Sequence, residues 1–334
     1  MMPFVRAIQA DRHAFSGKPA TMPPDPQPLI VLTGPTGVGK TAAGVRLARA
    51  LGGEIVNADS RYLYRGFDIG VAKPTAVERG GVPHHLIDIL PPDGEMSLAR
   101  FQELATEAIR DIQRRGRTPL LVGGTVLYVN AIVEGWAIPR VPPDEAFRAT
   151  SEASVGVDGG AALRAELAAI DPVVAARSGS NMRRVIRALE VYRATGVPMS
   201  EIEGRGRPPF RALEVALTMP RDLLYVQLDT RIATLIASGL VDEVRGLLAA
   251  GVPVRAPAMS SIGYRQLLPF LDGAKPLEQA IERIRADTRR YVRHQETWLR
   301  RNPRLTRLDV TLPGWQDDLE ATVRAFLLPS PGRS

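Results

Sequence analysis

Residues 34–41 have the types and spacing of a phosphate-binding loop. They match the pattern G-x-x-x-x-G-K-T, in which glycines let successive backbone N–H groups point into one concavity that holds a phosphate. The lysine adds a cation, and the threonine hydroxyl can hold Mg²⁺. The loop consists of Gly34, Pro35, Thr36, Gly37, Val38, Gly39, Lys40 and Thr41. We therefore expect phosphate binding here, although the pattern does not identify the phosphorylated molecule.

Asp59 is the second residue that could do chemistry. It lies near the end of residues 54–60, which are typical of a strand, and ligand chemistry collects at the carboxyl ends of strands in open parallel sheets. A general base or a metal ligand is expected at such a place. Asp59 could instead be the N-cap of a following helix that includes Tyr62 and Tyr64. The pattern leaves both interpretations open.

A third strand, at residues 118–122, is followed by Gly123, Gly124 and Thr125. A hydrolysing ATPase would normally have an aspartate that holds Mg²⁺ after this strand, so the sequence argues against a motor or a switch GTPase. The adjacent residues His84 and His85 would point in different directions on a strand. Since no third ligand lies at a suitable spacing, we expect a structural role for them.

Strands and helices alternate around these residues, which predicts an α/β fold with a parallel sheet. Further strands are expected at residues 29–32 and 212–219. Amphipathic helices are expected at residues 97–115, 222–250 and 280–301. The first would bury Phe101, Leu104, Ala108 and Ile112, and the last would bury Ile284, Tyr291 and Trp298.

The stretch from Pro139 to Pro209 has a different character, with helices expected at Ala161–Ile170 and Met182–Thr195. It reads as a helical insertion in the α/β core. Arg183 and Arg187 share one face of the second helix. Such arginines can simply be a solvated helix surface, and spacing alone slightly favours that interpretation.

Composition limits the class of protein. The chain has 334 residues, a net charge of +7 and a pI near 10, which suggests a polyanionic partner. It contains no cysteine, which excludes disulfides and thiolate metal sites, and no apolar run approaches the roughly 18 residues needed to cross a membrane. We expect a cytoplasmic protein without membrane association. Residues 1–27 are predicted to be a disordered extension, with Met22 as an alternative start.

Seven motifs together resemble those of the bacterial tRNA dimethylallyltransferases, also called tRNA isopentenyltransferases. They occur in the family's order between Leu29 and Arg301. They are GPTGVGKT (34–41), NADSRYLYRGFDIGVAKP (57–74), PHHLIDI (83–89), LVGGTVLYVNAI (121–132), RRVIRALEVYRATG (183–196), SSIGYRQL (260–267) and RRYVRHQETWLR (289–300).

The resemblance implies a P-loop NTPase-like parallel sheet core with a helical insertion domain. The core would comprise residues 28–140 and 210–310, the insertion residues 141–209, and a C-terminal helix and tail residues 311–334. The implied reaction transfers the dimethylallyl group of dimethylallyl diphosphate to N6 of adenine 37, next to the tRNA anticodon. Its products are N6-isopentenyladenosine and diphosphate.

The family pattern also assigns roles to residues. Asp59 would be the general base and Thr125 would hydrogen-bond near the reacting centre. The loop 34–41, Mg²⁺ on Thr41, and Arg231 would stabilise the departing diphosphate. The residues that correspond to contacts with the tRNA anticodon stem-loop are Asp59, Ser60, Arg61, Tyr62, Thr125, Arg148, Arg183, Arg184, Arg187, Ser261, Gly263, Tyr264, Arg265, Arg289, Arg293 and Gln295.

Two residues depart from the family pattern. Gln227 stands where an arginine is usual, which leaves Arg231 without the second arginine of a diphosphate-binding pair. His294 replaces a basic residue of a K-R-Q motif, and a free imidazole loses its charge near pH ~6.5. Two other functions remain open: a small-molecule P-loop kinase and a non-catalytic RNA-binding protein. We expect a monomer.

Overall fold

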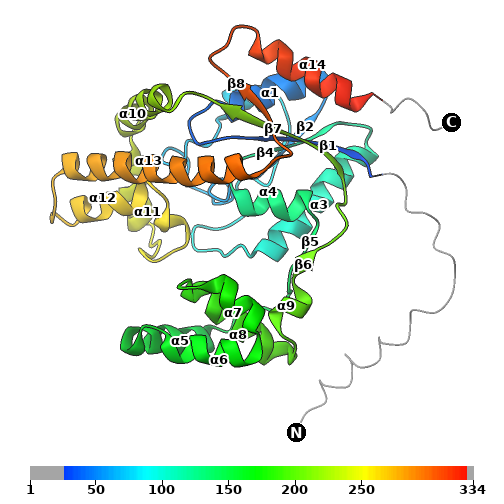
Figure 1. Cartoon of the computed structure of the whole chain (residues 1–334). Coiled ribbons are helices and arrows are strands. Elements are labelled where there is room, and N and C mark those ends of the chain that lie inside the picture. The colour runs from blue at the N-terminus through cyan, green and yellow to red at the C-terminus, as the bar shows by residue number, and fades with distance from the viewer. Residues whose placement is uncertain (1–25, 329–334) are drawn as a thin grey trace, which may run out of the picture.

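The computed structural model describes residues 26–328, which form a three-layer α/β core with a separate helical unit (Figure 1). The central sheet has six strands in the order β3-β2-β4-β1-β7-β8, all of them parallel. This confirms the expected fold class. The strands are β1 (Pro28–Thr33), β2 (Glu54–Asn57), β3 (His84–His85), β4 (Pro119–Val122), β7 (Arg211–Thr218) and β8 (Thr306–Asp309). Strand β8 was not expected from the sequence.

Each face of the sheet is covered by helices (Figure 1). Ile30 and Leu32 of β1 pack in a cluster with α1 (Lys40–Leu51) and α14 (Trp315–Leu327). Leu29 and Val31, which alternate with them, join a second cluster with α3 (Leu98–Arg114) and α4 (Val126–Val133). A short helix, α2 (Ala76–Arg79), lies in the loop between β2 and β3. The buried residues of α3 are Phe101, Ala105, Ile109 and Ile112. Leu104 and Ala108, which were expected in the core, are only partly buried.

Four helices pack beside the carboxyl ends of the strands. They are α10 (Arg221–Ala237), α11 (Leu240–Ala249), α12 (Tyr264–Leu271) and α13 (Leu277–Arg301), with a 3-10 turn at Ala258–Ser260. The expected single helix at 222–250 is wrong, because Gly239 has φ +99 and breaks it between α10 and α11. The side chain of Tyr291 was expected in the core, but the residue is 39% exposed.

The segment between α4 and β7 forms a helical unit with its own hydrophobic cluster. It contains α5 (Glu145–Asp158), α6 (Ala161–Ile170), α7 (Pro172–Ser178), α8 (Met182–Thr195) and α9 (Met199–Ile202). A two-stranded ribbon, β5 (Trp136–Ala137) and β6 (Gly204–Arg205), joins it to the core, and the unit stands apart from the sheet in Figure 1. Glu134 anchors the ribbon, since it pairs with Arg205 and with Arg304 of the core.

The predicted disordered extension lies almost wholly outside the described residues. Within 26–328, no helix combines the length and the apolar character that crossing a membrane requires.

Candidate functional site

The phosphate-binding loop connects β1 to α1 and is braced from two distant helices. The backbone N–H of Thr36 donates to Oε1 of Gln295 on α13 at 2.9 Å. Nε2 of Gln227 on α10 donates to the carbonyl of Gly37 at 2.8 Å. Gly34 is required at the start of the loop, since a Cβ there would lie 2.5 Å from the Leu217 carbonyl oxygen. Gln227 thus holds the loop through a neutral amide where the family pattern has a cation.

Lys40 lies at the first turn of α1, beside the loop. Its Nζ donates to the carbonyl of Pro35 at 2.8 Å. Burial lowers the pKa of Lys40 to about 8, opposed by the negative charge of Asp59 and reinforced by the positive charge of Arg231. A bound anion would compensate for that burial, so the loop is built to receive negative charge.

Asp59 follows β2 in a turn, so the alternative of a helix N-cap is wrong. Its Oδ1 accepts a hydrogen bond from the N–H of Arg61 at 2.9 Å. The buried Asn57 holds the Asp59 backbone from both sides, accepting from its N–H at 2.8 Å and donating to its carbonyl at 2.9 Å. The other carboxylate oxygen, Oδ2, accepts no hydrogen bond from residues 26–328. One oxygen therefore orients the side chain and the other is available as a base.

The turn after β4 places Thr125 against the Asp59 segment. A Cβ on Gly123 would lie 2.2 Å from the Ala58 carbonyl carbon, and one on Gly124 would lie 2.7 Å from Nε2 of Gln295. Oγ1 of Thr125 accepts from the N–H of Ser60 at 3.0 Å. A side chain at residue 123 would collide with the backbone of Ala58, so the turn as it is built here has no room for an aspartate at that position.

Two cavities meet at Asp59. The first, about 650 Å³, lies over the phosphate-binding loop and includes Lys40 and Thr41; we call it the donor cavity. The second, about 440 Å³, is lined by Thr125, the turn Ser260–Gly263 and α13; we call it the acceptor cavity. Residues lining both are Thr36, Asp59, Val71, Arg231 and Leu235. A phosphate-binding chamber therefore adjoins a second chamber, with a carboxylate, a cation and two apolar side chains at the junction.

Comparison with known proteins identifies the family. The model of the IPP transferase family matches residues 62–302. The tRNA dimethylallyltransferase of Thermomicrobium roseum is 54% identical over 302 residues, covering 90% of this chain and 92% of the relative. The corresponding protein of Chloroflexus aggregans is 52% identical and covers 86% and 98%. The chain belongs to the tRNA dimethylallyltransferase family.

Solved structures of this family have the same fold. The tRNA isopentenylpyrophosphate transferase of Bacillus halodurans superposes with a TM-score of 0.68 at 40% identity, covering 90% of this chain and 97% of that one. A eukaryotic dimethylallyltransferase acting on tRNA gives a TM-score of 0.74 at 28% identity, with coverage of 90% and 78%. The family resemblance noted in the sequence is thereby confirmed.

The arginines that match tRNA contacts of the dimethylallyltransferase family fall into two groups. Arg148 and Arg187 both pair with the buried carboxylate of Glu190, and Arg187 also donates to the carbonyl of Val141 at 2.8 Å. They fix the start of the insertion to α8. Others are paired as well: Arg184 with Glu203, Arg265 with Asp287 and Arg289 with Asp229. Within residues 26–328, Arg61, Arg183 and Arg293 form no ion pair.

Three predicted tRNA contacts are buried, which argues against direct contact through their side chains. Tyr264 is 0% exposed and its hydroxyl donates to Glu243. Both ends of the Gln295 amide are occupied, by Thr36 N–H and by the carbonyl of Gly124. The hydroxyl of Ser261 donates to the carbonyl of Ala258, although the residue still lines the acceptor cavity. These residues hold the walls of the site in place.

Tyr62 and Gly263 stay close to the predicted site. The hydroxyl of Tyr62 donates to the carbonyl of Ala72 at 2.9 Å, and burial raises its pKa to about 12. It lines the donor cavity, whereas Gly263 and Ser60 line the acceptor cavity. Reasoning from the sequence missed Asn57, whose signal was only its place beside Asp59, and Arg290 and Tyr291, which line the acceptor cavity.

The adjacent histidines make contacts that hold the short strand β3, and His84 also lines the donor cavity. Nε2 of His85 contacts the buried carboxylate of Glu54 at 2.8 Å, and Nδ1 of His84 contacts the carbonyl of Val82 at 2.8 Å. Both contacts tie β3 to its surroundings. These contacts are consistent with the structural role expected for His85, whereas the role of His84 stays a prediction because it also lines the donor cavity.

The residues at the donor cavity fit a magnesium ion that is held jointly with a diphosphate. Mg²⁺ typically keeps several waters and takes one or two protein ligands together with substrate phosphates. Across residues 26–328, no group of three histidine, cysteine, aspartate or glutamate side chains could hold a metal. Thr41 brings its hydroxyl to the N-terminus of α1 in this cavity. These residues therefore suit an Mg²⁺ ion that binds together with a phosphate ligand rather than one held by the protein alone.

The lowered pKa of Lys40 predicts a pH dependence. As pH rises through about 8, Lys40 in the free protein loses its proton, and a neutral amine does not attract an anion. Affinity for inorganic diphosphate should then fall, by up to about tenfold per pH unit. Diphosphate itself becomes more negative over this range, which acts in the opposite direction.

Titration calorimetry between pH 7 and 9.5 would measure this affinity. The matched variant Lys40→Met should bind diphosphate more weakly and should lack the decrease in affinity that the titration of Lys40 causes. Because the ligand titrates identically with both proteins, the ratio of wild-type to Lys40→Met affinity should fall as pH rises through about 8. A ratio that stays constant over this range would contradict the assignment.

Proposed function

We propose that this chain transfers the dimethylallyl group of dimethylallyl diphosphate to N6 of adenine 37 in tRNA. The observation that carries the proposal is the meeting of the donor and acceptor cavities at Asp59. A phosphorylated donor and a nucleobase acceptor can each occupy one cavity and react at the junction. The family relationship supports the same reaction, since the relatives are named tRNA dimethylallyltransferases.

On the donor side, the problem is the charge of the leaving group. The backbone N–H groups of the loop, Lys40 and Arg231 can surround the diphosphate, while Val71 and Leu235 offer an apolar surface to the C5 chain. When bound, Mg²⁺ on Thr41 and the diphosphate neutralises further charge. Negative charge grows on the bridging oxygen as the C1–O bond breaks, so these groups stabilise the transition state more than the ground state.

On the acceptor side, the exocyclic amine is a poor nucleophile. The adenine must leave its stack to reach the junction. Asp59 Oδ2 can take the proton from N6 as N6 bonds to C1, and the diphosphate leaves with the electrons of the broken C1–O bond. The Thr125 hydroxyl accepts a hydrogen bond from the Ser60 N–H and so fixes the position of the turn that carries Asp59. We also propose that the protein acts as a monomer in the cytoplasm.

A small-molecule kinase would share the loop and the sheet, and the donor distinguishes the two functions. The protein should release diphosphate from dimethylallyl diphosphate only when tRNA is present, and should release no phosphate from ATP. Colorimetric assay of both products, with each donor and with and without tRNA, makes the comparison. Transfer from ATP to a small acceptor would favour the kinase. Binding of tRNA without any diphosphate release would favour a non-catalytic RNA-binding protein.

The ion pairing of the insertion arginines predicts different effects for two residues on α8. Arg183 is exposed and unpaired among the described residues, so Arg183→Ala should weaken tRNA binding. It should also flatten the slope of log K against log salt by about 0.7–0.9, the effect of one lost phosphate contact.

Arg187→Ala is the matched control on the same helix. It should leave the slope unchanged and lower the free energy of unfolding by about 1–3 kcal/mol, because Val141 and Glu190 lose a donor. Filter binding at several salt concentrations and urea denaturation measure the two effects. If the slope flattened for Arg187→Ala and stayed unchanged for Arg183→Ala, then Arg187 rather than Arg183 would contact a tRNA phosphate.

A further inference from the structure

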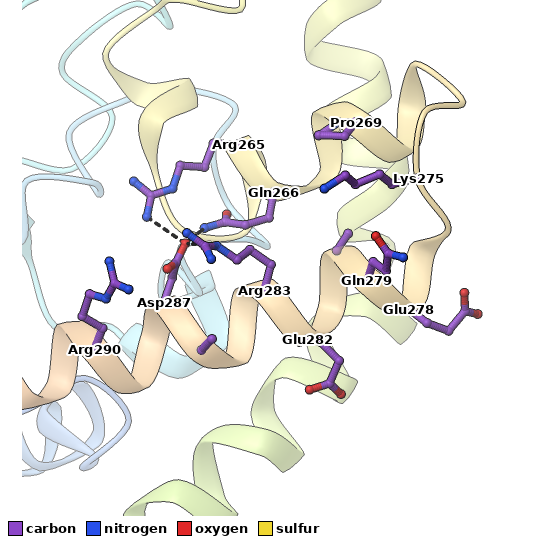
Figure 2. Close-up of a pocket in the computed structure, with 12 residues that line it drawn as sticks. Arg265, Gln266, Pro269, Lys275, Glu278, Gln279, Glu282, Arg283, Asp287 and Arg290 are labelled. Carbon is purple, nitrogen blue, oxygen red and sulfur yellow. Dashed lines mark hydrogen bonds and ion pairs between the residues drawn. The ribbon is translucent and has the colours of Figure 1, made fainter.

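A third cavity adjoins the acceptor cavity and lies between α12 and α13; we call it the α12–α13 cleft. It measures about 960 Å³, enough to receive a nucleotide, and Figure 2 shows the side chains that line it. Its floor is organised by the buried carboxylate of Asp287, which accepts from Nε2 of Gln266 at 2.8 Å and from Arg265 at 3.2 Å. Arg265, Asp287 and Arg290 line both this cleft and the acceptor cavity. The two spaces therefore share a wall.

The charges of the cleft are unequally distributed. At the end near the acceptor cavity, Arg265 and Arg283 both pair with Asp287. Arg290 lies at the same end, is exposed, and forms no ion pair with any residue in 26–328. Glu278 and Glu282 lie farther along α13, away from Arg290 (Figure 2). The far end also carries Lys275, and Glu282 there pairs with Arg285, so its charges nearly cancel. A polyanionic strand would thus be attracted most at the boundary with the acceptor cavity, where Arg290 is unpaired.

Arg290 also lies one helical turn before His294, and both line the acceptor cavity. Residues four apart project from the same face of a helix. His294 is the residue that replaces a basic residue of the family's K-R-Q motif. This chain thus lacks a permanent cation at position 294 and has one at position 290 on the same face of α13.

We propose that Arg290 binds a backbone phosphate next to the target adenine, in place of the cation missing at 294, and directs the adjoining nucleotide into the α12–α13 cleft. This rests on the proposed function, because it takes the acceptor cavity to hold a flipped adenine. A base drawn out of its stack needs its flanking backbone held. An unpaired guanidinium at the boundary of the two spaces can provide that contact with two N–H donors.

The test compares Arg290→Ala, His294→Arg and the double variant, with tRNA affinity measured by fluorescence anisotropy without donor. Arg290→Ala should weaken binding roughly tenfold, as for one lost charge-assisted hydrogen bond, and reduce the salt slope by about 0.7. Arg290→Lys should retain most of the affinity. His294→Arg should restore binding in the Arg290→Ala background and add little to the wild type.

Arg300→Ala is the matched control, since Arg300 is an exposed arginine of α13 outside both cavities. It should change affinity less than twofold. Equal effects of Arg290→Ala and Arg300→Ala would overturn the proposal, as would an equal gain from His294→Arg in both backgrounds. Because binding is measured without chemistry, a wild-type protein that binds tRNA but does not prenylate it would contradict the proposed function and not the role of Arg290.

Discussion

Asp59→Asn should lower turnover by roughly 10²–10⁴-fold, the usual contribution of a positioned acid–base group. The variant is close to a pure test of basicity. The amide oxygen of asparagine can still accept from the N–H of Arg61, so the turn is retained. What is lost is the negative charge and basicity of a carboxylate that lines both cavities.

The control for Asp59→Asn is tRNA affinity, which should change far less than turnover. Single-turnover rates with saturating donor separate the two quantities. If affinity and turnover fell by equal factors, Asp59 would be a recognition or structural residue, and the proton would have to leave N6 by another route.

Lys40→Met should lower kcat by about 10²–10³-fold, as when a preorganised group that stabilises developing charge is removed. In the free protein Lys40 contacts the carbonyl of Pro35, and it can turn to the diphosphate when donor binds. Because the leaving group gains charge only as the C1–O bond breaks, the loss should appear mainly in kcat. Steady-state kinetics with varied dimethylallyl diphosphate measure the division between kcat and KM.

A Lys40→Met variant with unchanged kcat and a raised donor KM would mean that Lys40 only binds the ground state. Circular dichroism and thermal melting would check that the loop substitution leaves the fold intact.

Local patterns in the sequence located the segments that the structure brings together around Asp59. The loop 34–41 has the spacing of a phosphate-binding turn, and Asp59 and Thr125 each follow an apolar strand. Because parallel strands end at one edge of the sheet, these three segments were expected to meet there. The helices Ala161–Ile170 and Met182–Thr195 were placed correctly. Short polar breaks bound both of them, and the second also has Asn181 as its N-cap and Gly196 as its C-cap.

What could not be predicted depends on contacts between residues distant in the sequence. Nothing local indicates that Glu190 is buried and pairs with Arg148 and Arg187, so the part these two arginines play in holding the insertion could not be read from the sequence. Gln295 matched a tRNA-contact motif, yet it braces the loop at Thr36 and the turn at Gly124. Tyr291 was assigned to the core because it lies seven residues from both Ile284 and Trp298, but the buried residue of α13 at this point is the neighbouring Val292.

The most direct test of the proposed function is mass analysis of nucleosides from tRNA that has been incubated with the protein, dimethylallyl diphosphate and Mg²⁺. One adenosine per acceptor tRNA should gain a C5H8 unit on N6 at position 37, and the Asp59→Asn protein should give almost none in the same time. An unchanged adenosine peak, with tRNA that a known tRNA dimethylallyltransferase does modify under the same conditions, would contradict the proposal.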